Sequence, residues 1–68
     1  MWALNYKKAL RLAIDILELS ESEAKEFLEM LSFARALLGD DIDGLWSFLS
    51  IYYDEDAVYE FLAEIGWL

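Results

Sequence analysis

Carboxylates are the residues of this chain whose number and spacing could do chemistry. Fourteen of its 68 residues are Asp or Glu and five are Lys or Arg, which gives a net charge of −9. There is no His or Cys, so no serine has the usual base that activates a nucleophile. The imidazole and thiolate ligands of transition metals are missing as well. We therefore expect neither an enzyme nor a site for a metal or another cofactor.

One acidic run resembles part of a calcium-binding loop. Asp41, Asp43 and Gly44 have the spacing of the third, fifth and sixth positions of such a loop. Its first and twelfth positions, where acidic side chains supply ligands, are occupied by Gly39 and Ser50. Because two of the essential ligands are missing, we do not expect this run to bind calcium.

The acids are unevenly distributed along the chain. Residues 1–35 hold six acids and all five bases, for a net charge of −1, whereas residues 36–68 hold eight acids and no base, for −8. Such asymmetry indicates a positively charged partner. The alternative is that the acids only cap helices and keep an apolar chain soluble.

Three acids of the second half are not explained by helix capping. Asp56, Glu60 and Glu64 stand four residues apart, so on a helix they form a row with a rise of about 6 Å between neighbours. A rigid row of carboxylates resembles a phosphate backbone, although each DNA strand carries a charge about every 3.4 Å. Mimicry of DNA would need further acids, from the Asp40–Asp43 cluster or from a second subunit. The acidic partner-binding surface that we expect consists of Asp40, Asp41, Asp43, Asp54, Asp56, Glu60 and Glu64.

Aromatic residues provide a second candidate surface. The four phenylalanines fall on apolar helical faces and are expected in the core; they are Phe27, Phe33, Phe48 and Phe61. Six further large rings are too many for the core of so short a chain to cover, and Trp and Tyr are favoured at binding hot spots. We expect these six to contact a partner or a second copy; they are Trp2, Trp46, Tyr52, Tyr53, Tyr59 and Trp67.

Capping signals and helical periodicity place the first half of the chain on two helices. Apolar residues recur every three or four positions over residues 2–19. Ser20 and Glu23 then form an S-x-x-E capping box, which predicts the start of a helix over 21–38. Gly39 ends this helix, because a residue without a side chain adopts the left-handed conformation of a helix stop.

The second half predicts two more helices. Residues 45–53 would suit a buried strand or a buried helix, and we choose a helix over 41–53 because no other strand is available to pair with it. Asp54 caps a helix over 55–65, and Gly66 ends it. The expected fold is therefore all-α, a compact bundle of four short helices in a single domain of 68 residues.

The size and charge of the chain also limit the kinds of partner that it can bind. A chain this short buries only about 60% of its unfolded surface, so without disulfides we expect it to self-associate, as a homodimer. The basic cluster Lys7, Lys8 and Arg11 is too small for direct binding of nucleic acid or of a membrane. No stretch is long and uncharged enough for a signal peptide or a membrane span, which predicts a soluble, intracellular, cytoplasmic protein.

The function expected from these features is a non-catalytic, self-associating interaction module that binds or regulates another protein. Its specific form would be an inhibitor of a basic, nucleic-acid-handling protein that acts by DNA mimicry, of the kind that phages and mobile elements carry. The alternative is a purely structural or scaffolding homo-oligomer, which would gain nothing from the acidic half.

Overall fold

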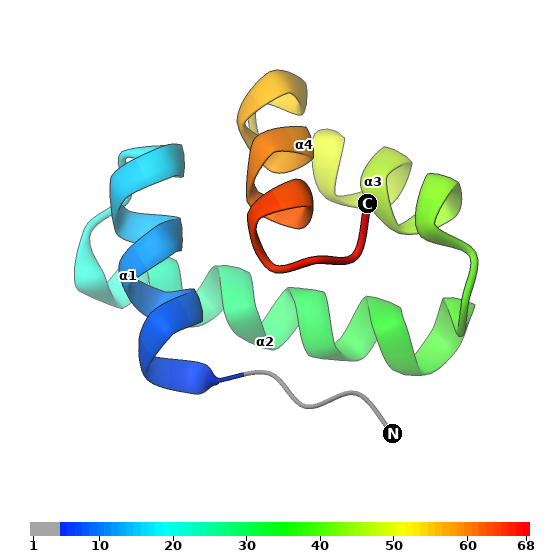
Figure 1. The fold of residues 1–68 in the computed structure, drawn as a ribbon, viewed down its shortest axis with the longest axis horizontal. Coiled ribbons are helices and arrows are strands. Elements are labelled where there is room, and N and C mark those ends of the chain that lie inside the picture. Colours follow the sequence, from blue (N-terminus) through cyan, green and yellow to red (C-terminus); the bar gives the residue numbers. More distant parts are fainter. Residues whose placement is uncertain (1–4) are drawn as a thin grey trace.

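The computed structural model describes residues 5–68, which form four helices and no strand (Figure 1). The helices are α1 (Tyr6–Leu17), α2 (Glu21–Leu38), α3 (Ile42–Ser50) and α4 (Glu55–Glu64). The long helix α2 runs along one side, with α1 against its first turns and α3 beside its last turns, and α4 lies between α1 and α3 (Figure 1). The predicted all-α bundle of four helices is confirmed.

The core is built from one inward-facing stripe of each helix. Phe27 of α2 packs edge-to-face against Phe61 of α4 and against Tyr53, with ring centroids 4.9 Å apart in both pairs. Such pairs contribute about 0.5–1.5 kcal/mol beyond the burial of their surface. The buried residues are all apolar among those described, and they are Ala9, Ala13, Ala24, Phe27, Leu28, Leu31, Ala34, Leu45, Leu49, Val58, Phe61 and Leu62.

The core prediction is wrong for Phe33. Phe27 and Phe61 are fully buried and Phe48 is half-buried, but 60% of Phe33 is exposed. The other three helices lie on one side of α2 (Figure 1). Leu31 faces them, and residues two apart on a helix do not share a face. Phe33 therefore points away from the bundle.

The first helix begins later than the predicted span 2–19. Asn5 is its N-cap, because the Lys8 N–H donates to Asn5 Oδ1 at 3.2 Å. The helix then starts at Tyr6. Trp2, where the predicted span starts, lies outside the described residues.

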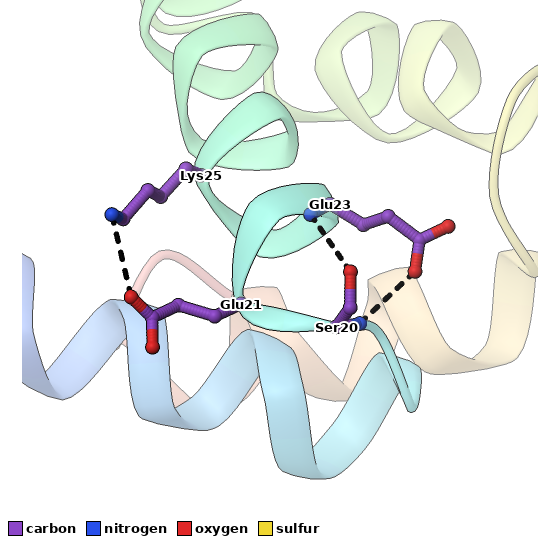
Figure 2. Close-up of polar contacts among 4 residues, drawn as sticks. All are labelled: Ser20, Glu21, Glu23 and Lys25. Carbon is purple, nitrogen blue, oxygen red and sulfur yellow. Dashed lines mark hydrogen bonds and ion pairs between the residues drawn. The ribbon is translucent and has the colours of Figure 1, made fainter.

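The capping box that opens α2 is confirmed (Figure 2). The Glu23 N–H donates to Ser20 Oγ at 3.2 Å, and the Ser20 N–H donates to Glu23 Oε1 at 3.0 Å. The bond from the Ser20 backbone is the main reason that the pKa of the Glu23 carboxyl lies below its ordinary value of 4.5. Glu21 and Lys25, one helical turn apart in α2, form an ion pair in which Lys25 Nζ lies 3.3 Å from Glu21 Oε2 (Figure 2).

The residues directly after α1 and α2 have positive φ. Glu18 has φ 54° and ψ 42°, which ends α1 at Leu17, two residues before the predicted end. Gly39 ends α2 as predicted, but its φ of 61° and ψ of −124° correspond to the first central position of a type II′ turn and not to the expected left-handed helix. The turn closes where the Asp41 N–H donates to the Leu38 carbonyl at 3.2 Å.

The prediction of a helix, and not a strand, for the aromatic run of the second half is confirmed, but the predicted span 41–53 is too long. Asp41 is the N-cap and the helix ends at Ser50. Beyond it, the N–H groups of Ile51 and Tyr52 donate to carbonyls three residues back, at 3.3 and 3.1 Å. This tighter winding ends the helix and lets the chain turn towards α4.

The last helix ends at Glu64, one residue sooner than predicted. The Gly66 N–H donates to the Ala63 carbonyl at 3.1 Å, and the Trp67 N–H donates to the Leu62 carbonyl at 3.0 Å. These two bonds form the Schellman stop that the glycine predicts. They also fold the indole of Trp67 back against the core.

Candidate functional site

All fourteen acidic residues lie on the surface, and the described residues bury no charged side chain. Within residues 5–68, ion pairs hold only Glu21, with Lys25, and Asp40, with Arg35. The second pair joins Arg35 Nη2 and Asp40 Oδ1 at 3.4 Å. Twelve of the fourteen carboxylates therefore form no ion pair in the described part of the chain.

Two acids of the predicted surface act as helix caps. The Gly44 N–H donates to Asp41 Oδ1 at 2.9 Å, and the Ala57 N–H donates to Asp54 Oδ2 at 3.0 Å. A Cβ atom at Gly44 would lie 2.5 Å from Asp41 Oδ2, so the Asp41 carboxylate would have to shift if any other residue replaced this glycine. The acid–glycine run that resembles a calcium loop is thus the start of α3. No group of acids within residues 5–68 is placed to hold a metal ion.

The predicted row of carboxylates lies along the outer side of α4. Asp56, Glu60 and Glu64 are exposed, whereas Val58 and Phe61 of the same helix are buried. Neighbours in the row are four residues apart, so each pair of like charges weakens the isolated helix by about 0.2–0.5 kcal/mol. The row therefore does not stabilise the fold.

A pocket of about 270 Å³ lies between the start of α3 and the middle of α4. It is lined by Asp43, Trp46, Tyr59 and Leu68. Asp43 belongs to the predicted acidic surface, and Trp46 and Tyr59 belong to the predicted aromatic surface. The Trp46 indole N–H donates to the Glu55 carbonyl at 3.0 Å, which ties the ring to the first turn of α4. Tyr59 is 57% exposed.

Trp67, the other tryptophan of the described residues, lies beside a cation. The guanidinium carbon of Arg35 lies 4.8 Å from the centroid of the Trp67 ring, a cation–π distance. The same guanidinium forms the ion pair with Asp40. The sequence alone gave no reason to single out Arg35, because 32 positions separate it from Trp67.

The two neighbouring tyrosines of the aromatic set have different roles. Tyr53 is half-buried, and its hydroxyl donates to the sulfur of Met30 at 3.7 Å. Burial, and then the negative charges of Glu26 and Glu23, raise the pKa of Tyr53 above its ordinary value of 10.0. Tyr52 is exposed, with its ring centroid 5.7 Å from that of Phe48.

The five aromatic candidates among the described residues have different surroundings. Trp46 and Tyr59 share the pocket, Trp67 lies beside Arg35, Tyr53 packs on the core and Tyr52 is exposed. Trp2 lies outside the described residues. The described residues include no helix that is both long and apolar enough to cross a membrane. Comparison of the chain with protein-family models, curated proteins and solved structures gives no match.

Proposed function

We propose that the protein is a non-catalytic interaction module whose acidic half, residues 36–68, binds and regulates a positively charged protein. The observation that carries the proposal is the exposure of all eight acids of this half, of which only Asp40 has a cationic neighbour within residues 5–68. A concentrated negative field of this kind attracts a basic partner and increases its association rate.

Helix capping and solubility explain only part of this charge. Asp41 and Asp54 cap helices, but Glu60 and Glu64 lie beyond the first turn of α4, where the helix dipole no longer favours an acid. Their repulsion costs helix stability, and no base of the described residues offsets it. A cationic surface on a partner would turn this cost into binding energy.

The narrower form of the proposal is inhibition by DNA mimicry. A partner that binds DNA has a basic groove that reads the phosphate backbone. The row on α4 has about half the charge density of one DNA strand, since its rise is about 6 Å per charge and not 3.4 Å. The acids at the start of α3 are the further charges that a mimic of a phosphate strand would need.

The experiment starts with affinity capture from the cells that make the protein, washed at about 50 and about 500 mM salt, because screening separates charge-driven from apolar binding. The captured protein is then purified and its DNA binding is measured with and without this chain. We expect a basic protein, released by high salt, whose DNA binding this chain inhibits.

Two triple variants of equal net charge locate the binding surface. Asp56→Lys, Glu60→Lys and Glu64→Lys change the net charge from −9 to −3, and so do Asp15→Lys, Glu26→Lys and Glu29→Lys in the first half. All six residues are exposed. We expect the first triple variant to slow association with the purified partner by about tenfold or more and the second to have a much smaller effect. Equal effects would mean that net charge, and not the row on α4, drives binding.

Self-association belongs to the same proposal and is shared by the scaffolding alternative. Phe33 and Leu37 lie four residues apart on α2, so they share a face, and they are 60% and 69% exposed. Light scattering over about 10–100 μM should give at least twice the 7.9 kDa of one chain. Replacing both residues with Ser should give a folded monomer. A scaffold would then lose its function, whereas an acidic binding module would keep it.

A further inference from the structure

We infer that the pocket formed by Asp43, Trp46, Tyr59 and Leu68 receives an arginine side chain of the basic partner. The inference rests on the proposed function and adds to it the side chain that anchors the complex. The pocket, at about 270 Å³, lies at the lower limit of the roughly 300–1,000 Å³ typical of small-molecule sites, and it is large enough for one side chain.

The lining matches the parts of an arginine side chain. Two aromatic rings attract a planar cation, and the carboxylate of Asp43 accepts hydrogen bonds from a guanidinium. Leu68 and the carbon atoms of the rings provide apolar surface for the methylene stem. A lysine ammonium would keep the charge but lose the planar stacking and the paired hydrogen bonds.

The molecule already contains this arrangement once, with its own arginine in place. The Arg35 guanidinium lies 4.8 Å from the Trp67 ring centroid and 3.4 Å from Asp40. Trp46 and Asp43 repeat the tryptophan and the aspartate at the pocket, but no arginine or lysine of the described residues lines it. A partner would supply the missing cation.

The pocket is prepared for binding before a partner arrives. The Trp46 indole N–H is held by the Glu55 carbonyl at 3.0 Å, so little ring freedom is lost when a cation binds. Glu55 lies four residues before Tyr59 on α4, and so shares its side of the helix. Its charge adds to that of Asp43 and concentrates cations at the mouth of the pocket.

The test uses two acetylated peptides, one of alternating Gly and Arg and one of alternating Gly and Lys. Binding is followed by the chemical shift of the Trp46 indole N–H in ¹H–¹⁵N spectra. We expect the Arg peptide to move this resonance at low salt and to bind at least about threefold more tightly than the Lys peptide, which is the size of an exposed cation–π preference.

Two of the lining residues, Asp43 and Tyr59, have matched controls. Asp43 and Asp56 occupy the same second position of α3 and α4 and are both exposed, so Asp43→Asn and Asp56→Asn change net charge and helix dipole equally. Tyr59→Leu is matched by Tyr52→Leu, since Tyr59 is 57% and Tyr52 is 61% exposed. We expect each pocket variant to weaken the Arg peptide about fivefold and each control less than about twofold.

The outcomes separate this inference from the proposed function. If D43N and D56N weaken the Arg peptide equally and Y59L has no effect, binding follows charge alone: the pocket inference is overturned while the acidic module stands. An Arg peptide that binds without moving the Trp46 resonance, or no more tightly than the Lys peptide, also overturns it. Failure of the proposed function is seen separately, as a captured partner whose binding does not depend on the acids of α4.

Discussion

The two helix pairs of this protein, α1–α2 and α3–α4, fold in the same way but differ in charge. Each helix begins at a capping side chain and buries one apolar stripe, and neither pair buries a charge within residues 5–68. Yet residues 1–35 have a net charge of −1 and residues 36–68 have −8. The same kind of fold therefore forms with and without a large excess of negative charge.

The N-cap residues of the two helix pairs also differ in charge but not in capping ability. Asn5 and Ser20 cap α1 and α2, whereas Asp41 and Asp54 cap α3 and α4. Asn, Ser and Asp are about equally good N-caps. Because neutral caps are present in the first half, we expect that the negative charge of Asp41 and Asp54 is not needed for capping.

The largest expected loss of stability tests whether the two halves share one hydrophobic core. Phe27→Ala removes the ring that contacts Phe61 and Tyr53 from the opposite half. Loss of a buried Phe costs about 3–5 kcal/mol, which is most of the stability of so small a protein. Urea denaturation followed by circular dichroism should show both halves unfolding together.

Phe33→Ala is the control, because it makes the same change on the same helix at an exposed site. At chain concentrations too low for self-association through Phe33, its free energy of unfolding should change by less than about 0.5 kcal/mol. If α1 and α2 stayed folded in the Phe27 variant, the two halves would fold independently of each other.

The number, type and approximate bounds of the helices followed from the sequence because capping and periodicity are local. The helix ends were less accurate. Glu18 ends α1 with a positive φ that its residue type does not predict, and α3 ends at Ser50 because the chain must turn towards Asp54. Phe33 was misplaced for a global reason, since only the packing of the other helices on one side of α2 decides which of its apolar flanks is covered.

The next largest effect tests whether the caps of the two halves are equivalent. Ser20→Ala removes the acceptor of the Glu23 N–H and should lower the free energy of unfolding by about 1 kcal/mol. Asp54→Asn keeps an acceptor for the Ala57 N–H and removes only a charge, so its loss should be much smaller. Thermal melts of both variants check this. A large loss in Asp54→Asn would show that the second half needs its charge to fold.

A smaller effect, of opposite sign, is expected where the acids repel each other. Glu60→Gln removes two like-charge pairs, with Asp56 and Glu64, and should stabilise the protein by about 0.5 kcal/mol at low salt. The gain should disappear at high salt. Glu29→Gln is the control, because Glu29 stands four residues from Lys25, and it should give no gain. Equal gains from both variants would mean that the repulsion is spread over the whole surface.

The candidate site was less predictable than the fold. The exposure of the acids follows from their charge, but the pocket that joins Asp43 to Tyr59 depends on how α3 and α4 pack. The contact between Arg35 and Trp67 likewise joins residues far apart in the chain. Periodicity within one helix does not show which residues of different helices come into contact. The sequence therefore indicated the residues of the site but not which of them lie together.

The smallest expected effect concerns a charge interaction between the two halves. Tyr53 belongs to the acidic half, but its pKa is raised by burial and by Glu26 and Glu23 of the first half. The folded state therefore holds the phenolic proton more tightly than the unfolded state. This contribution to stability is complete below the unfolded pKa of about 10 and is lost as pH rises through the raised folded pKa.

Tyr53→Phe isolates this interaction. At pH 7 the variant should lose less than about 0.5 kcal/mol, because the thioether of Met30 is a weak acceptor for the missing hydroxyl. As pH rises above about 10, the urea midpoint of the unchanged protein should fall further than that of the variant. Replacing Glu23 and Glu26 with Gln should reduce this difference while keeping a capping side chain at position 23. Midpoints that fall in parallel would show that neither burial nor the acids of the first half affect the titration of Tyr53.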